Sequence, residues 1–202
     1  MRRFSAKNVL IEWRWSAITS PASPVKAGAL YRGPAFRAHN PRWSWAPLSG
    51  EGAALYGGRF NAQATPALYL ATDAATAMRE AAHGFPLKLV DPLTIVSYEV
   101  DCADIVDLTS AAVRRAKRIV PEQLGCGWLA LQQEKRPVPS QLIAARLIAD
   151  GAAGILVRSF APGSTENNIN LVLWRWSDKL PHKVRVHDPD RRLPKDGRSW
   201  GR

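Results

Sequence analysis

Short apolar runs with strand periodicity recur along the chain and predict a sheet. Between residues 94 and 100, Ile95, Ser97 and Glu99 alternate with Val96, Tyr98 and Val100, so that each set falls on one face of a strand. Apolar runs of strand length also occupy residues 67–71, 155–158 and 169–174. We predict two further strands, at residues 29–33, which end in Gly-Pro, and at residues 183–187.

Helical segments lie between these strands. The alanine-rich run 74–80 follows a capping residue, Thr72 or Asp73, and we expect it to stop at Gly84. Further helices are predicted near residues 110–119, from Pro121 to about Arg136, and at 141–150, where Ser140 is the expected cap and Gly151 the terminator. Strands and helices mix without a regular βαβ rhythm, which favours an α+β fold over a doubly wound sheet.

A chain of 202 residues suits one domain with modest extensions. We expect an N-terminal extension at 1–27, a compact domain at 28–176 and a basic tail at 177–202. Residues 34–58 are rich in Pro, Gly, Ser and Trp without a sustained period, and we predict a long loop there. No apolar run approaches the length of a membrane helix, and the start lacks the features of a signal peptide. We therefore expect a cytoplasmic protein.

The positive charge gathers at the two ends of the sequence. The net charge is +11, and residues 1–50 contain eight Lys or Arg and one acidic residue. Residues 179–202 contain eight basic and three acidic residues, whereas residues 51–178 are nearly balanced. Basic ends suit nucleic acid, an acidic protein or an anionic substrate, and they also suit a merely solvated surface. Three pairs of tryptophans are each spaced by two residues, namely Trp13 and Trp15, Trp43 and Trp45, and Trp174 and Trp176. On a strand, both rings of such a pair would share one face. A shared face suits either core packing or a partner surface.

The sequence lacks the common catalytic signatures. It has no Gly-rich dinucleotide loop, no phosphate-binding loop, no His-Glu-x-x-His and no Gly-x-Ser-x-Gly. The two cysteines, Cys102 and Cys126, have no Cys-x-x-Cys spacing and are expected to be reduced thiols rather than metal ligands.

A scattered set of residues could carry chemistry. Gly57-Gly58-Arg59 combines a permissive backbone with a guanidinium that could bind phosphate, although such an arginine is ordinarily solvated. Tyr69 on a strand could face a cleft or the core, and Glu80 could lie on a covered or a solvated helix face. Arg158-Ser159 ends an apolar strand, where a buried arginine would need an anion or a route to solvent.

Taken in order, these pieces resemble the RES-domain family, which is named for an Arg, a Glu and a Ser. The resemblance covers about residues 28–176 and rests on five segments, namely Leu30-Tyr31-Arg32, Gly58-Arg59-Phe60-Asn61, Ala67-Leu68-Tyr69-Leu70-Ala71 followed by Glu80, Gly151 to Ser159, and Asn170 to Trp174. The chain departs from the simplest family pattern in the long Trp-rich segment before Gly57 and in residues 163–168.

The resemblance implies a fold like that of bacterial ADP-ribosyltransferase toxins and a reaction that consumes NAD. Family members look like toxins of toxin–antitoxin pairs, neutralised by an Xre-like antitoxin with a helix-turn-helix, which we expect to block the NAD cleft. Some are taken to transfer ADP-ribose to water or phosphate. Others are taken to modify a protein such as phosphoribosyl pyrophosphate synthetase. No metal cofactor and no membrane partner are implied.

The resemblance also assigns roles to residues. Glu80 would stabilise the positive charge that grows on the ribose as the nicotinamide bond breaks, while Arg32 and Arg59 would hold the pyrophosphate. Tyr69 would stack on nicotinamide and orient the bond, Tyr31 would line the same cleft, and Ser159 would position a ribose or phosphate oxygen. The alternative hypothesis is a basic nucleic-acid-binding module without catalysis, which needs a continuous basic stripe with exposed aromatic residues instead of converging arginines.

Overall fold

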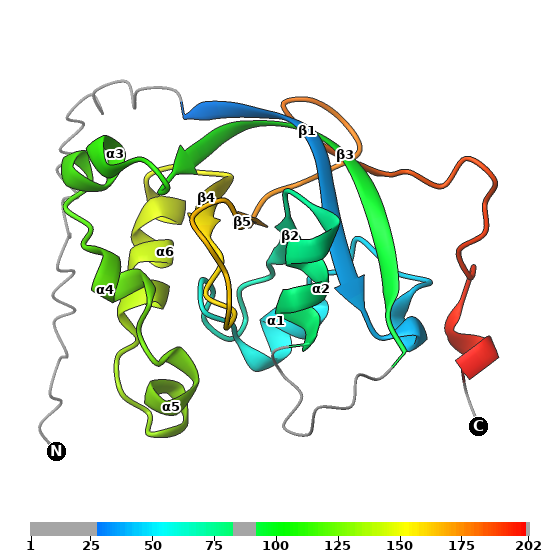
Figure 1. Ribbon diagram of the computed structural model, residues 1–202, viewed down its shortest axis with the longest axis horizontal. Helices are drawn as coiled ribbons and strands as arrows, with labels where there is room; N and C mark the ends of the chain where they lie inside the picture. The colour runs from blue at the N-terminus through cyan, green and yellow to red at the C-terminus, as the bar shows by residue number, and fades with distance from the viewer. Residues whose placement is uncertain (1–27, 83–91, 201–202) are drawn as a thin grey trace, which may run out of the picture.

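The long strand β3 (Thr94–Asp107) organises the sheet in the computed structural model, which describes residues 28–82 and 92–200. It pairs antiparallel with β1 (Ala29–His39) and with β6 (His182–Val186), and parallel with β4 (Gly154–Arg158). From β4 the pairing continues antiparallel to β5 (Ile169–Leu173), then to β2 (Leu68–Ala71), and returns to β1 at Phe36 and Ala71. Five strands therefore form a closed ring of pairings, with β6 added at β3 (Figure 1).

Helices lie around this ring. The helix α2 (Ala74–Ala82) packs against β1, and four helices lie on the side of β4 (Figure 1). These four are α3 (Ala111–Ala116), α4 (Pro121–Leu124), α5 (Trp128–Gln133) and α6 (Pro139–Ala149). Two of them, α4 and α6, pack against β4 and β5. The shorter elements are a 3₁₀ turn at Pro41–Trp43, α1 (Glu51–Tyr56) and a 3₁₀ turn at Gly197–Trp200. The α+β class expected from the sequence is confirmed.

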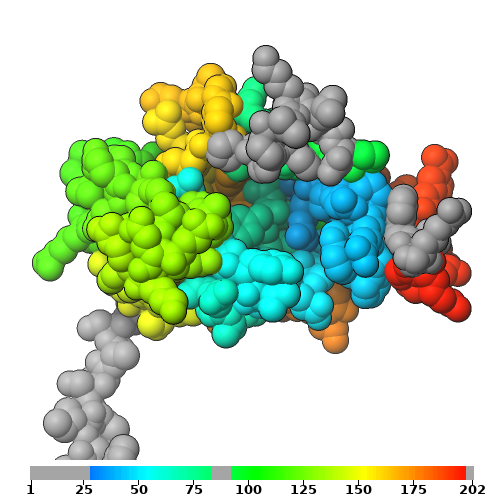
Figure 2. All heavy atoms as spheres, turned by 90° about the horizontal axis from the view of Figure 1, so that it is seen from below, coloured from blue at the N-terminus to red at the C-terminus, as the bar shows by residue number. Residues whose placement is uncertain are grey.

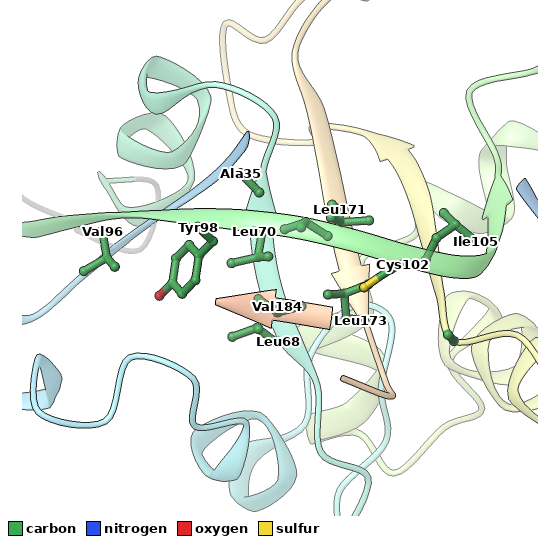
Figure 3. Close-up of a cluster of buried hydrophobic side chains, with 12 residues drawn as sticks. Ala35, Leu68, Leu70, Val96, Tyr98, Cys102, Ile105, Leu171, Leu173 and Val184 are labelled. Carbon is green, nitrogen blue, oxygen red and sulfur yellow. The ribbon is translucent and has the colours of Figure 1, made fainter. Parts of the chain in front are cut away.

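Strand alternation divides the core into two clusters. Leu171 and Leu173 of β5 point into a cluster inside the ring of strands, together with Leu68 and Leu70 of β2 (Figure 3). Val172, between them, points the other way and packs with Ile155 and the buried faces of α4 and α6. The period-two pattern of the sequence thus places one set of side chains in each cluster.

The segment predicted as a long loop contains a strand and a helix. β1 does not end at Gly33 but continues through Pro34 to His39, because ten residues of it pair with β3. The partner strand overrides the turn signal of Gly-Pro, and Pro34 is tolerated at an exposed position. The loop prediction was therefore wrong for residues 34–39 and 51–56.

Other local predictions were also corrected. The helix expected from Pro121 to Arg136 is two short helices, separated by Gly125-Cys126-Gly127. Ser140 does not cap α6, because the helix already starts at Pro139 and the Ser140 hydroxyl donates to the carbonyl of Arg59 (2.6 Å). The expected helix stop at Gly84 lies outside the described residues.

The two tryptophan pairs within the described residues do not share strand faces. Trp43 and Trp45 lie in and just after the 3₁₀ turn that follows β1, and both are exposed. Trp174 packs in the cluster beneath the helices, whereas Trp176 packs against the cluster inside the ring. Trp13 and Trp15 lie outside the described residues. The strand β6 falls within the residues expected to form the tail, and none of the described helices is long and apolar enough to cross a membrane.

Candidate active site

The carboxylate of Glu80 is held from two neighbouring strands. Glu80 lies on α2 and is half-buried, and its Oε1 accepts a bond from the Ser159 hydroxyl (2.6 Å) and another from the Asn170 side-chain amide (2.6 Å). Ser159 immediately follows β4, and Asn170 lies on β5. Both bonds end on Oε1, so Oε2 has no hydrogen bond to any residue in the described ranges.

A second set of bonds fixes α2 against the loop that joins β4 to β5. Asp73 accepts from the backbone amide and the hydroxyl of Thr76 (2.8 and 2.6 Å), which caps the first turn of α2. The side-chain amide of Asn168 then donates to the Thr76 hydroxyl (2.7 Å). The helix that carries Glu80 and the loop that carries Ser159 are therefore joined at two points.

The hydroxyl of Tyr69 is held by two hydrogen bonds, so its aromatic ring is the part that can face a ligand. The hydroxyl donates to Oδ1 of Asn61 (2.7 Å) and accepts from the Phe60 amide (3.0 Å). The phenol is protonated at neutral pH, and burial raises the pKa of Tyr69 further. Gly58 makes this contact possible, because a Cβ there would lie 2.5 Å from the Tyr69 hydroxyl.

Arg59 leaves the same turn, and its charge is felt by Tyr69 and Glu80, although Arg59 does not line the cavity that these two residues share. Its Nη1 donates to the carbonyls of Cys126 (2.7 Å) and Leu124 (3.3 Å), and its guanidinium lies 4.6 Å from the ring centroid of Phe160. Burial lowers the pKa of Arg59, while Cys126, Glu80 and Tyr69 act in the opposite direction. No carboxylate within salt-bridge distance neutralises it among the described residues.

A second half-buried arginine, Arg37, lines a cavity together with Tyr69 and Glu80. The cavity has a volume of about 260 Å³, and its wall also includes Asn170 of β5. We call it the Glu80 cavity. Nη1 of Arg37 donates to the carbonyls of Pro47 (3.2 Å) and Ser49 (3.1 Å), and burial lowers its pKa. Figure 2 shows the molecule hollowed between α1, the end of β1 and α5, with residues of β2 and α2 at the bottom of the hollow.

The structure does not bring Arg32 and Tyr31 to the Glu80 cavity. Arg32 is exposed, pairs with Asp101 on β3 (3.0 Å) and lines a different depression with Lys183 and His187. Arg32 and Arg37 are five residues apart on one strand, so their side chains point to opposite faces. Tyr31 shares the face of Arg37, but the two residues are six positions apart along the strand, which is about 20 Å. The Tyr31 hydroxyl donates to the Pro34 carbonyl (2.6 Å) and its ring packs against the core.

A comparison with protein-family models identifies the family of the chain. The model of the RES domain matches residues 34–196 of the chain. This chain belongs to the RES-domain family. The matched range includes Arg37, Arg59, Tyr69, Glu80 and Ser159, and it begins after Tyr31 and Arg32. No curated protein sequence matches the chain.

Among solved structures, this RES domain resembles a chain of the M. tuberculosis MbcT–MbcA toxin–antitoxin complex. The match has a TM-score of 0.56 and 22% sequence identity, and it covers 80% of this chain and 85% of the other. At that identity the similarity concerns the fold. It agrees with the fold expected from the resemblance of the sequence.

Three residues of the site were missed in the sequence of this RES domain. Arg37 was placed in the presumed loop, because the prolines and tryptophans around it hide the strand alternation that continues from Ala29. Asn61 and Asn170 appeared only as parts of matching segments, and nothing in their local pattern indicated that their side chains fix Tyr69 and Glu80. In the described residues, no group of three or more His, Cys, Asp or Glu could hold a metal ion.

We predict that Tyr69→Phe destabilises this RES domain. The change removes the bonds of the hydroxyl to Asn61 and to the Phe60 amide, which are buried, and should lower the free energy of unfolding by about 1–3 kcal/mol. Urea denaturation followed by fluorescence measures the effect. Tyr56→Phe is the matched control, because Tyr56 is 70% exposed, and it should change stability by less than about 0.5 kcal/mol. Equal stability of the two variants would contradict the role given to the Tyr69 hydroxyl.

Proposed function

We propose that this RES domain is a toxin that breaks the bond between nicotinamide and ribose in NAD and transfers the ADP-ribose. The observation that carries the proposal is the Glu80 carboxylate, fixed by Ser159 and Asn170 in a cavity that it shares with Tyr69 and Arg37. A carboxylate suits this reaction, because positive charge grows on the ribose as the bond breaks.

In this proposal Glu80 acts through its second oxygen. Oε1 is occupied by the bonds from Ser159 and Asn170, so the carboxylate cannot rotate freely. Oε2 would accept a hydrogen bond from the ribose hydroxyl next to the scissile bond, and its negative charge would oppose the developing oxocarbenium. A preorganised charge of this kind needs little rearrangement during the reaction, which is the usual source of electrostatic catalysis.

The contacts of Tyr69 and Ser159 refine their roles. The Tyr69 hydroxyl is engaged by Asn61 and Phe60, so the ring face is the part that would stack on nicotinamide. Ser159 is 8% exposed, and its hydroxyl bonds Glu80 and lies 2.8 Å from the Ser164 hydroxyl. These contacts support a role for Ser159 in positioning Glu80. They give less support to the role expected from the sequence, in which Ser159 contacts a ribose or phosphate oxygen.

The pyrophosphate would bind to Arg37 and Arg59. Both guanidinium groups are held by backbone carbonyls through Nη1, which orients them without cancelling their charge. Charge-assisted bonds from arginine to phosphate contribute about 1.5–3 kcal/mol each. Arg32 was the sequence-based candidate for this role, and its contact with Asp101 supports a surface ion pair instead.

The toxin role implies an inhibitor and an acceptor. We propose that a cognate Xre-like antitoxin blocks NAD entry with an acidic or carboxy-terminal segment, because a carboxylate could take the place of the phosphates at Arg37 and Arg59. Water, phosphate or a protein such as phosphoribosyl pyrophosphate synthetase would accept the ADP-ribose. A chain of the same fold belongs to the MbcT–MbcA toxin–antitoxin complex, and this supports the partnership.

We predict that Glu80→Gln strongly slows NAD consumption while NAD still binds. The amide keeps the shape of the side chain and loses the charge, so the rate of nicotinamide release should fall about 10²–10⁴-fold. Chromatography of nicotinamide, ADP-ribose and ADP-ribose phosphate, with and without cell lysate, measures the rate and identifies the acceptor. The control is Glu122→Gln on α4, which is exposed and should leave the rate unchanged. If wild type releases no nicotinamide, the proposed function fails.

A second prediction separates the two arginines of β1. Arg37→Ala should raise KM for NAD about tenfold or more, since it removes a charge-assisted contact to phosphate. Arg32→Ala should keep KM and kcat within about threefold of wild type, because the Arg32–Asp101 pair is a surface contact. Steady-state kinetics measures both variants. A larger effect of Arg32→Ala than of Arg37→Ala would restore the original assignment.

A third prediction concerns the antitoxin. Production of the wild-type chain alone should arrest growth and deplete cellular NAD, whereas co-production with the neighbouring gene should restore both. Because the inhibitor would approach a basic cleft, association of the purified pair should slow markedly between low and high salt. Growth curves and stopped-flow binding measure these effects. Normal growth and normal NAD in cells that make the wild-type chain alone would argue for a binding module instead of a toxin.

A further inference from the structure

A second cavity adjoins the Glu80 cavity at the end of β1. It has a volume of about 630 Å³ and lies between the turn after β1 and α1. Four large side chains of its wall are 41–70% exposed, namely Trp43, Trp45, Leu55 and Tyr56. We call it the aromatic cavity. Its volume falls in the range of small-molecule sites, about 300–1,000 Å³, and exposed aromatic side chains gathered around a hollow indicate a ligand.

Arg37 lies in the walls of both cavities. Its Nη1 is held by the carbonyls of Pro47 and Ser49, so the guanidinium is fixed at the boundary between them. The Tyr98 side chain is a further hydrogen-bonding neighbour of Arg37. No carboxylate of the described residues lies within salt-bridge distance of it, so its positive charge remains available to an anionic ligand. A ligand that crosses this boundary would have one end beside Glu80 and the other end among the aromatic side chains. An anionic group between the two ends would then lie at Arg37.

We propose that the aromatic cavity binds the adenosine half of NAD, with the adenine ring against Trp43 and Tyr56. The inference rests on the proposed function and extends it, because NAD carries its pyrophosphate between the nicotinamide riboside and the adenosine. With the riboside beside Glu80 and the pyrophosphate at Arg37, the adenosine falls into the aromatic cavity.

The chemistry of the wall suits a neutral, planar heterocycle. Indole and phenol rings stack on nucleobases. Burial and the nearby charge of Arg37 lower the pKa of His39 to about 4, so the imidazole in the wall is neutral at pH 7. Nδ1 of His39 has no hydrogen-bond partner in the described part of the chain. Glu51 lies in the same wall, and its negative charge disfavours an acidic peptide as the occupant.

The test measures the two halves of NAD separately on the full chain. AMP carries the adenosine half and nicotinamide mononucleotide carries the other half, and calorimetry gives Kd for each. AMP is measured on wild type, and nicotinamide mononucleotide on the Glu80→Gln chain, which should not consume it. Trp43→Ala and Tyr56→Ala remove the proposed stacking surfaces, and both side chains are exposed, so the fold should tolerate the changes. Leu142→Ala on α6 is the control, because Leu142 is also an exposed apolar side chain (60%).

We expect AMP to bind wild type and to bind Trp43→Ala and Tyr56→Ala about five- to hundredfold more weakly, the range for loss of one stacked ring. When each change is combined with Glu80→Gln, the Kd for nicotinamide mononucleotide should stay within about twofold of the Glu80→Gln value. Leu142→Ala should change neither the Kd for AMP nor the Kd for nicotinamide mononucleotide. The proposal is overturned if AMP does not bind, if both halves weaken equally, or if Trp43→Ala and Tyr56→Ala leave AMP binding intact. If AMP fails to bind and an acidic antitoxin segment binds in the aromatic cavity instead, the cavity is a protein-docking site. If wild type binds AMP in this way but consumes no NAD, the proposed function fails and the adenosine site stands.

Discussion

The hydrogen-bonded carboxylate of Glu80 constrains the site more than any other contact. It needs α2, the end of β4 and the start of β5 to be in place at once, because Ser159 follows β4 and Asn170 is the second residue of β5. The bond from Asn168 to Thr76 adds a second connection between α2 and the β4–β5 loop. Buried networks of this type are costly when one member is missing, so the ring of strands and the position of Glu80 depend on each other.

The two central arginines are held differently from those on the surface. Arg37 and Arg59 are half-buried and bonded to backbone carbonyls, whereas Arg32, Arg158 and Arg198 are exposed and paired with carboxylates. A carbonyl orients a guanidinium and leaves its positive charge uncompensated. Keeping such a charge away from water costs free energy, and burial accordingly lowers the pKa of both groups. Strain of this kind is typical of functional sites, because an anionic ligand relieves it.

The loop from residue 40 to residue 50 links the two cavities to the core. The Tyr98 hydroxyl, which lies inside the ring of strands, donates to the Pro47 carbonyl (2.8 Å) that also accepts from Arg37. The indole of Trp176 donates to the neighbouring Leu48 carbonyl (3.1 Å). The aromatic cavity is therefore built on backbone that the core holds in place, although its tryptophans are exposed.

Local sequence determined most of the elements and part of the site. Alternation in residues 94–100 and the apolar runs at 67–71 and 169–174 specified strands, because side chains of period two must divide between two faces. Order and residue type indicated the RES family and brought Arg59, Tyr69, Glu80 and Ser159 forward as candidates. Only the tertiary structure decided which arginine of β1 belongs with Glu80. Pairing with β3 extended the strand past Pro34, and strand alternation then turned Arg37 toward the cavity and Arg32 toward Asp101. A contact between residues far apart in the chain depends on strand register, and register is set by the partner strand, which the local sequence does not contain.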